Sequence, residues 1–183
     1  MPNITIDLTS QPTISNPSID LTYLTNGFSF TNGALTSKTI THNELTYSYI
    51  KFNAIAGTVS VTMGVSSESN YDFMSLNVST STITPSRNGG NMKNISGSVS
   101  DTTYTYTISS AGWYYLYFWY AKDGSQNTNN DNGWLKKVIL PVLETKQIYL
   151  NVNGVWKPVT PYVNVNGVWK EATPSLNVNG TWK

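Results

Sequence analysis

The sequence predicts an all-β protein, with a β-sandwich between an extended N-terminal leader and a C-terminal array of three short β-hairpins. Aromatic residues make up 13% of the 183 residues, including 12 Tyr and 6 Trp. Aromatic and β-branched residues favour strands. Only 11% of the residues are charged, and no stretch has the Ala-, Glu- and Lys-rich background that is typical of helices. Repeated Asn-Gly pairs near the C-terminus are the third indication, because this pair between β-prone residues is the strongest local signal for a two-residue hairpin.

Residues 1–25 are expected to form the extended leader. Ile4, Ile6 and Leu8 alternate with polar residues, and a stretch rich in Pro, Ser and Thr follows. Prolines remove ladder donors and therefore interrupt strands. The pattern leaves two alternatives open. The segment is either a flexible chain end or a particle-docking strand that adds to the sheet of a neighbouring subunit.

Residues 26–145 are expected to form the sandwich, because short strand-forming runs alternate there with stretches rich in Gly, Ser and Asn. The predicted strands are Gly27–Thr31, Leu45–Ala54, Thr58–Val65, Asp72–Ser79, Thr102–Ile108, Trp113–Ala121 and Trp134–Leu143. Nearly every residue of Gly112–Ala121 is aromatic or aliphatic. We therefore predict that this strand is central and covered on both faces, in preference to forming an aromatic ligand platform.

Residues 146–183 contain three copies of a 13-residue repeat, each with an Asn-Gly pair shortly before a Trp. With Asn153-Gly154 as the turn, Val152 pairs with Val155, and Asn151 pairs with Trp156. A single hairpin is barely stable in water, so the repeats require one another, a partner chain or a ligand. Their aromatic side chains are candidates for assembly contacts, which we favour, or for stacking on a glycan: Tyr149, Trp156, Tyr162, Trp169 and Trp182.

Several motifs of the predicted sandwich occur in a familiar order. A Ser-Glu-Ser-Asn-Tyr-Asp turn at 67–72 precedes the Gly-started aromatic strand, and Tyr-Ala-Lys-Asp-Gly-Ser at 120–125 follows that strand. This order resembles the jelly-roll modules of bacterial and phage surface proteins, and it implies a jelly-roll-like sandwich. The residues that match the pattern are Glu68, Tyr71, Asp72, Lys122, Asp123 and Asp131.

The tandem Val-Asn-Gly-Val-Trp-Lys hairpins resemble those of structural proteins of tailed bacteriophages, especially fibre, tail and head-decoration proteins. The resemblance implies a non-enzymatic virion protein, which is a fibre, spike or decoration subunit on the capsid or tail. It also implies homo-oligomers, with trimers favoured, and contacts with other virion proteins through the leader. The alternative is a carbohydrate-binding adhesin that recognises glycans of the host surface. The first residues lack the basic and apolar regions of a secretory signal, so we expect assembly in the host cytoplasm and a place on the virion surface.

Four carboxylates are the candidate metal ligands. If the loops at one end of the sandwich bring them together, they suit Ca²⁺, which takes six to eight oxygen ligands. The alternative is that Asp72 and Asp123 cap turns or pair with Lys122. The four candidates are Glu68, Asp72, Asp123 and Asp131.

The composition argues against an enzyme and against some partners. There is no Cys, and His42 is the only histidine, so a Cys-His pair and a His-rich zinc site are excluded. A glycosidase needs two carboxylates beside a substrate cleft. Glu68 and Asp72 could supply the carboxylates, but the sequence predicts no cleft, so we do not expect a glycosidase. The net charge of +1 gives no general attraction to nucleic acid or to an anionic membrane. No apolar run is long enough for membrane insertion.

Overall fold

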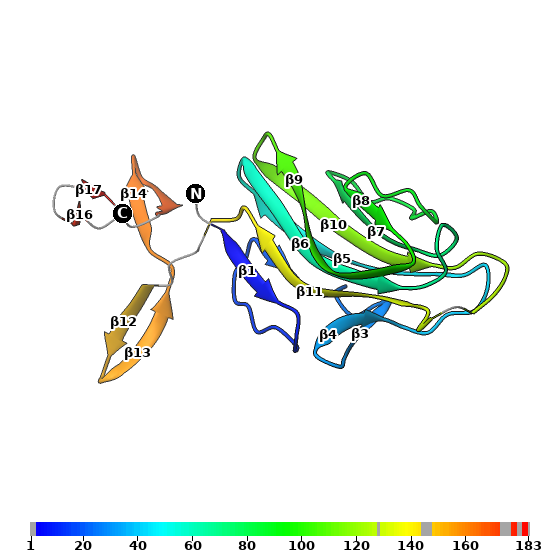
Figure 1. The fold of residues 1–183 in the computed structure, drawn as a ribbon. Coiled ribbons are helices and arrows are strands. Elements are labelled where there is room, and N and C mark those ends of the chain that lie inside the picture. The colour runs from blue at the N-terminus through cyan, green and yellow to red at the C-terminus, as the bar shows by residue number, and fades with distance from the viewer. Residues whose placement is uncertain (1–2, 128, 144–147, 173–176, 179–180, 183) are drawn as a thin grey trace. The chain divides into compact units, whose positions relative to one another are not determined.

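A computed structural model describes residues 3–127, 129–143, 148–172, 177–178 and 181–182 (Figure 1). The chain divides into two compact units, Met1–Glu144 and Thr145–Lys183, and we describe each by itself. The secondary structure of the described residues consists of antiparallel strands, which confirms the all-β fold class. None of these residues belongs to a helix that could span a membrane.

The first unit is a sandwich of two sheets (Figure 1). The first sheet has the order β3-β4-β11-β6-β9, and β1 pairs with β11 beside this path. Its strands are β1 (Ile4–Asp7), β3 (Phe28–Thr31), β4 (Ala34–Ser37), β6 (Gly57–Ser66), β9 (Ser98–Ile108) and β11 (Asn132–Leu140). The second sheet has the order β2-β5-β10-β7-β8. Its strands are β2 (Ile19–Asp20), β5 (Leu45–Ala54), β7 (Phe73–Ser79), β8 (Lys93–Ile95) and β10 (Gly112–Ala121).

The strand order from β4 to β11 is that of a jelly roll. These strands form the orders β4-β11-β6-β9 and β5-β10-β7-β8, one in each sheet. The chain therefore passes from one sheet to the other at nearly every connection, and only β7 and β8 follow each other in the same sheet. Two such interleaved four-stranded sheets define the jelly-roll architecture. The predicted jelly-roll-like sandwich is thus confirmed.

The segment expected as an extended leader belongs to the sandwich from Ile4 onward. Ile4–Asp7 pairs with Lys137–Leu140 of β11, and the N–H of Leu8 donates to the carbonyl of Lys136 at 2.8 Å. Ile6 and Leu8 are fully buried. The alternation in this segment therefore reflects a strand with one face on the core of its own domain. β1 therefore pairs with a strand of its own chain, whereas the sequence left open whether it pairs with a neighbouring subunit.

The sandwich core lies between the sheets and is rich in aromatic residues. Alternate residues of β10 point into it, including Leu116 and Phe118, which are both fully buried. The ring of Phe118 meets that of Phe28 edge to face, with 4.9 Å between centroids. Burial of one such side chain contributes about 1.5–3 kcal/mol. β10 pairs with β5 on one side and β7 on the other, so it is a central strand as predicted.

The second unit contains three hairpins. Their strands are β12 (Ile148–Val152), β13 (Val155–Val159), β14 (Tyr162–Val165), β15 (Val168–Glu171), β16 (Asn177–Val178) and β17 (Thr181–Trp182). Val152 pairs with Val155 and Asn151 pairs with Trp156, as predicted. Asn153 and Gly154 both have positive φ angles, of 55° and 82°, which is the requirement of a type I′ turn.

An asparagine in each of the first two repeats stabilises the turn. The side-chain oxygen of Asn151 accepts a hydrogen bond from the N–H of Gly154 at 2.8 Å. Asn164 makes the equivalent bond to Gly167 at 2.9 Å. The repeat therefore specifies its turn twice, once through the Asn-Gly pair and once through the asparagine that precedes it.

Candidate functional site

The outer face of the second sheet carries a continuous group of aromatic side chains. The residues of β5 and β10 that alternate with the core residues point to this face. Lys51 is paired with Tyr115, and two residues along each strand Tyr49 is paired with Tyr117. Ring centroids of Tyr49 and Tyr115 are 5.6 Å apart, and Tyr23 stacks on Tyr49 at 4.6 Å. We call this group the aromatic shelf and define it by Tyr23, Tyr47, Tyr49, Lys51, Trp113 and Tyr115.

Only one half of this face is open to solvent. Over the second half of β10, Trp119 is fully buried, Tyr117 is nearly so, and Ile83 packs against both. The indole N–H of Trp119 donates to the carbonyl of Ser86 at 2.9 Å, which fixes the covering loop. At the other end Trp113 is 45% exposed. The predicted covering of both faces therefore holds for the second half of β10 and does not hold for the first.

The open half is rigid and polar at its edges. Tyr23 is 47% exposed and stacks on the more buried ring of Tyr49. Tyr47 is 37% exposed, but it is paired with Trp119 and therefore lies beside the covered half. Burial, together with the neighbouring Tyr23, raises the pKa of Tyr49 to about 12.

Lys51 is the cation of the shelf. Its Nζ lies 5.0 Å from the ring centroid of Trp113 and 5.7 Å from that of Tyr115. Both distances are within the range of a cation–π interaction. Asp20 on β2 is the cross-strand partner of Lys51, and its Oδ1 accepts the backbone N–H of Thr22 at 2.9 Å. The hydrogen bonds from Thr22 lower the pKa of Asp20, with a smaller contribution from Lys51.

The four predicted metal ligands meet at one end of the sandwich. Carboxylate oxygens of Glu68, Asp72 and Asp123 all lie within 4.8 Å of one another. The fourth acid, Asp131, is bound by the Lys122 ammonium at 2.6 Å, and Asp72 lies 3.5 Å from the same ammonium. The structure thus contains features of both alternatives, a convergent acid cluster and a pairing of two of its members with Lys122. Tyr71, which also matches the jelly-roll pattern, is exposed.

The acid cluster has more negative than positive charge. Besides its two acids, Lys122 donates to the side-chain oxygen of Asn127 at 3.0 Å, and its side chain is only 1% exposed. Asp72 Oδ1 accepts the N–H of Asp123 at 2.9 Å. Burial raises the pKa of Glu68, and Asp123 and Asp72 raise it further. Such a cluster favours a proton or an additional cation, so calcium binding here stays a prediction.

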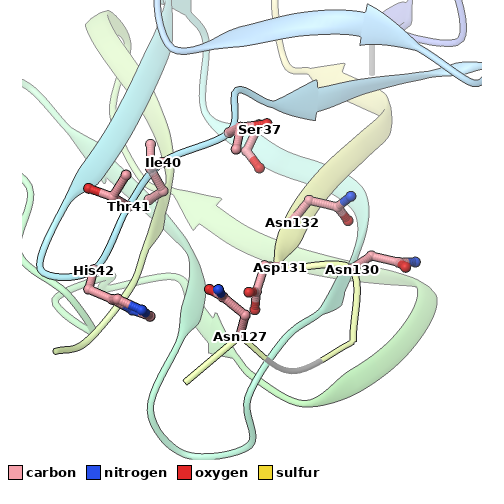
Figure 2. Close-up of a pocket in the computed structure, with 9 residues that line it drawn as sticks. Ser37, Ile40, Thr41, His42, Asn127, Asn130, Asp131 and Asn132 are labelled. Atoms are coloured by element: carbon pink, nitrogen blue, oxygen red, sulfur yellow. The ribbon is translucent and has the colours of Figure 1, made fainter. Parts of the chain in front are cut away.

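A polar pocket of about 430 Å³ opens next to this cluster (Figure 2). Figure 2 shows Asp131 between two of the asparagines that line the pocket, and His42 on the opposite strand connection. The lining residues are Ser37, Thr39, Ile40, Thr41, His42, Asn127, Asn130, Asp131 and Asn132. The pocket offers hydrogen-bonding groups without the ring of a Tyr, Trp or Phe. It is therefore a less suitable stacking surface than the aromatic shelf.

The aromatic residues of the repeats are described only in part. Tyr162 and Trp169 are 57% and 68% exposed on the β14–β15 hairpin. Their strand positions place them on the same face, since Trp169 pairs with Asn164, two residues from Tyr162. The side chains of Tyr149, Trp156 and Trp182 lie outside the described residues. Both roles predicted for this set, assembly and glycan stacking, therefore stay open.

The sequence favoured a core strand over an aromatic ligand platform at Gly112–Ala121, so the aromatic shelf was not predicted, although its signal is present. Tyr47 and Tyr49 are two residues apart, as are Trp113 and Tyr115. Period-two spacing of aromatic residues on two strands predicts one aromatic face if the strands are neighbours. The pairing of β5 with β10 supplies that condition.

Comparison with known proteins gives little further information. No family model matches the chain, and no curated protein matches it. One solved structure, that of TmCBM61 in complex with β-1,4-galactotriose, is similar with a TM-score of 0.30 and 10% sequence identity. The match covers 76% of this chain and 88% of the other. A similarity of this degree supports no inference about function, which therefore has to come from the site itself.

Proposed function

We propose that this protein is a non-catalytic glycan-binding protein of a virion surface, and that the aromatic shelf is its binding site. The observation that supports this proposal is an open group of flat rings on and beside the paired strands β5 and β10, with Trp113 and Tyr23 exposed at its surface. Sugar rings have apolar C–H faces and a polar rim of hydroxyl groups. Tyr and Trp present the complementary combination of an apolar face and a hydrogen-bonding group.

The rigidity of the shelf supports this assignment over the other exposed aromatic residues. All of its rings except that of Tyr23 are on β5 and β10, whose ten-residue pairing is continuous from Leu45 to Ala54. Sites on paired strands hold their geometry better than sites on loops. Few side chains would have to be ordered on binding, so little conformational entropy is lost.

The test is binding of the full chain to immobilised cell-wall and capsular polysaccharides from bacteria. Trp113→Ala should lower the affinity at least about tenfold, as truncation of a central Trp commonly does at binding hot spots. Tyr71→Ala is the matched control, because Tyr71 is 51% exposed and is not part of the aromatic shelf. Equal binding by the wild type and Trp113→Ala would refute the assignment.

The hairpin unit supports a second role, in homo-oligomerisation. On β14–β15 apolar residues are exposed on both faces, with Val168 at 58% on one and Trp169 at 68% on the other. Isolated hairpins are marginally stable in water, and contacts between copies would bury these side chains. We propose that the repeats join copies of the chain, as a trimeric fibre or decoration subunit requires. Several copies would also convert weak glycan binding into avidity.

Light scattering of the full chain and of a chain truncated after Glu144 tests this second role. The full chain should be an oligomer and the truncated chain a monomer. A monomeric full chain would contradict the assembly role and would leave the repeat aromatics as a second candidate surface for glycans.

A further inference from the structure

The position of Lys51 gives the shelf a charge preference. The lysine lies on β5 beside the most open part of the shelf, and cation–π contacts hold its ammonium near the rings of Trp113 and Tyr115. An unrestrained lysine on an exposed strand would extend into water. Here the ammonium is held at the surface on which a sugar ring would stack, so a ligand meets a cation that is already placed.

The neighbouring carboxylate does not neutralise this ammonium by direct contact. Among the described residues, ion pairs of 4.0 Å or less involve Arg87, Lys122 and Lys136, and Lys51 is in none of them. The carboxylate of Asp20 is instead hydrogen-bonded to Thr22. Among the described residues, the Lys51 ammonium also donates no hydrogen bond that a ligand would have to replace.

From these contacts we infer that the shelf prefers glycans that carry an anionic group, such as a uronate, phosphate or sulfate, and that Lys51 binds this group. The inference rests on the proposed glycan-binding function. A sugar that packs on Trp113 or Tyr115 would meet the Lys51 ammonium, which lies over both rings, and an anionic substituent of the sugar would accept a charge-assisted hydrogen bond from it. Such bonds are about twice as strong as those of a neutral hydroxyl.

The selectivity would be local. The whole chain has a net charge of +1, which gives no long-range attraction to an anionic polymer. The preference should therefore depend on one side chain. It should also weaken with salt, because the pair would be near the surface, where ions screen it.

The experiment uses an array of acidic oligosaccharides and their neutral counterparts: uronates with their methyl esters, and phosphorylated or sulfated sugars with the unsubstituted ones. The full chain should bind at least one acidic member about tenfold more tightly than its neutral counterpart, the effect of one charge-assisted bond. Lys51→Gln should lose this preference and retain the affinity for the neutral sugar. Lys93→Gln is the matched control, since Lys93 also lies over an aromatic ring, 5.1 Å from Tyr104, away from the shelf.

The outcomes separate the two proposals. Equal affinity of the wild type for acidic and neutral members, or a preference that Lys51→Gln retains, overturns the charge preference and leaves glycan binding in place. Binding that Trp113→Ala does not weaken, or no binding to any member of the array, overturns both. If Lys51→Gln unfolds, the salt dependence of wild-type binding decides: equal salt dependence for acidic and neutral sugars refutes the inference.

Discussion

Two lysines of this protein each bind an aspartate at the same distance, but one pair is buried and the other is exposed. Loss of the two ammonium groups should therefore change the stability of the protein by very different amounts. The Lys122 ammonium is 2.6 Å from Asp131 in a pair whose lysine side chain is 1% exposed. The Lys136 ammonium is also 2.6 Å from its partner, Asp101, but both side chains are over one-third exposed. Removal of one partner from a buried pair costs about 3–5 kcal/mol, because the other charge stays buried and unpaired. An exposed pair contributes about 0–1 kcal/mol.

We therefore predict that Lys122→Met lowers the free energy of unfolding by about 3–5 kcal/mol, a large part of the roughly 5–15 kcal/mol of a typical domain. Lys136→Met should lower it by at most about 1 kcal/mol. Urea unfolding followed by tryptophan fluorescence measures both, and circular dichroism confirms that each variant is folded without urea. Equal losses in the two variants would refute the reasoning, because burial would then not determine the cost of the missing ammonium.

Three further predictions concern other parts of the sandwich. A Cβ at Gly64 would overlap the Trp134 ring, so Gly64→Ala should lower the free energy of unfolding by about 1–3 kcal/mol in urea, and an unchanged midpoint would contradict this packing. The raised pKa of Tyr49, about 12, means that its contribution to stability is complete below about pH 10 and is lost as the pH rises toward 12. Burial also raises the pKa values of Tyr117 and Tyr120, so ultraviolet titration should show several late tyrosinates, one of which Tyr49→Phe removes, and identical curves would exclude the assignment. Millimolar calcium should raise the unfolding temperature of the wild type and not of Glu68→Gln, and no rise in the wild type would leave Lys122 and Arg87 as the cations of the cluster.

The strands of the sandwich could be predicted where their residues alternate strongly. The predicted strand Leu45–Ala54 coincides with β5, and the predicted central strand is β10. β4 was missed although Asn32-Gly33 carries the same turn signal as the repeats, and both residues have positive φ angles of 53° and 70°. β8 has only three residues in a polar stretch, too few to show a pattern.

The sites were harder to predict, because they depend on which strands are neighbours. Pairing of Ala121 with Phe73 brings Lys122 beside Asp72, a contact between residues 50 positions apart that no local pattern encodes. The sequence identified the residues of the acid cluster. It did not show which of these acids pair with Lys122 and which converge on one another. The open half of the shelf depends in addition on the loop that Trp119 holds over the other half.

Chemical-shift mapping by nuclear magnetic resonance shows whether glycans bind to the open half of the second sheet's outer face, when the full chain is titrated with an oligosaccharide that it binds. The largest shifts should occur at Trp113, Tyr115 and Tyr49. Shifts confined to the pocket around Asn130 and Asp131, or to the hairpin repeats, with the aromatic shelf unchanged, would show that glycans bind elsewhere.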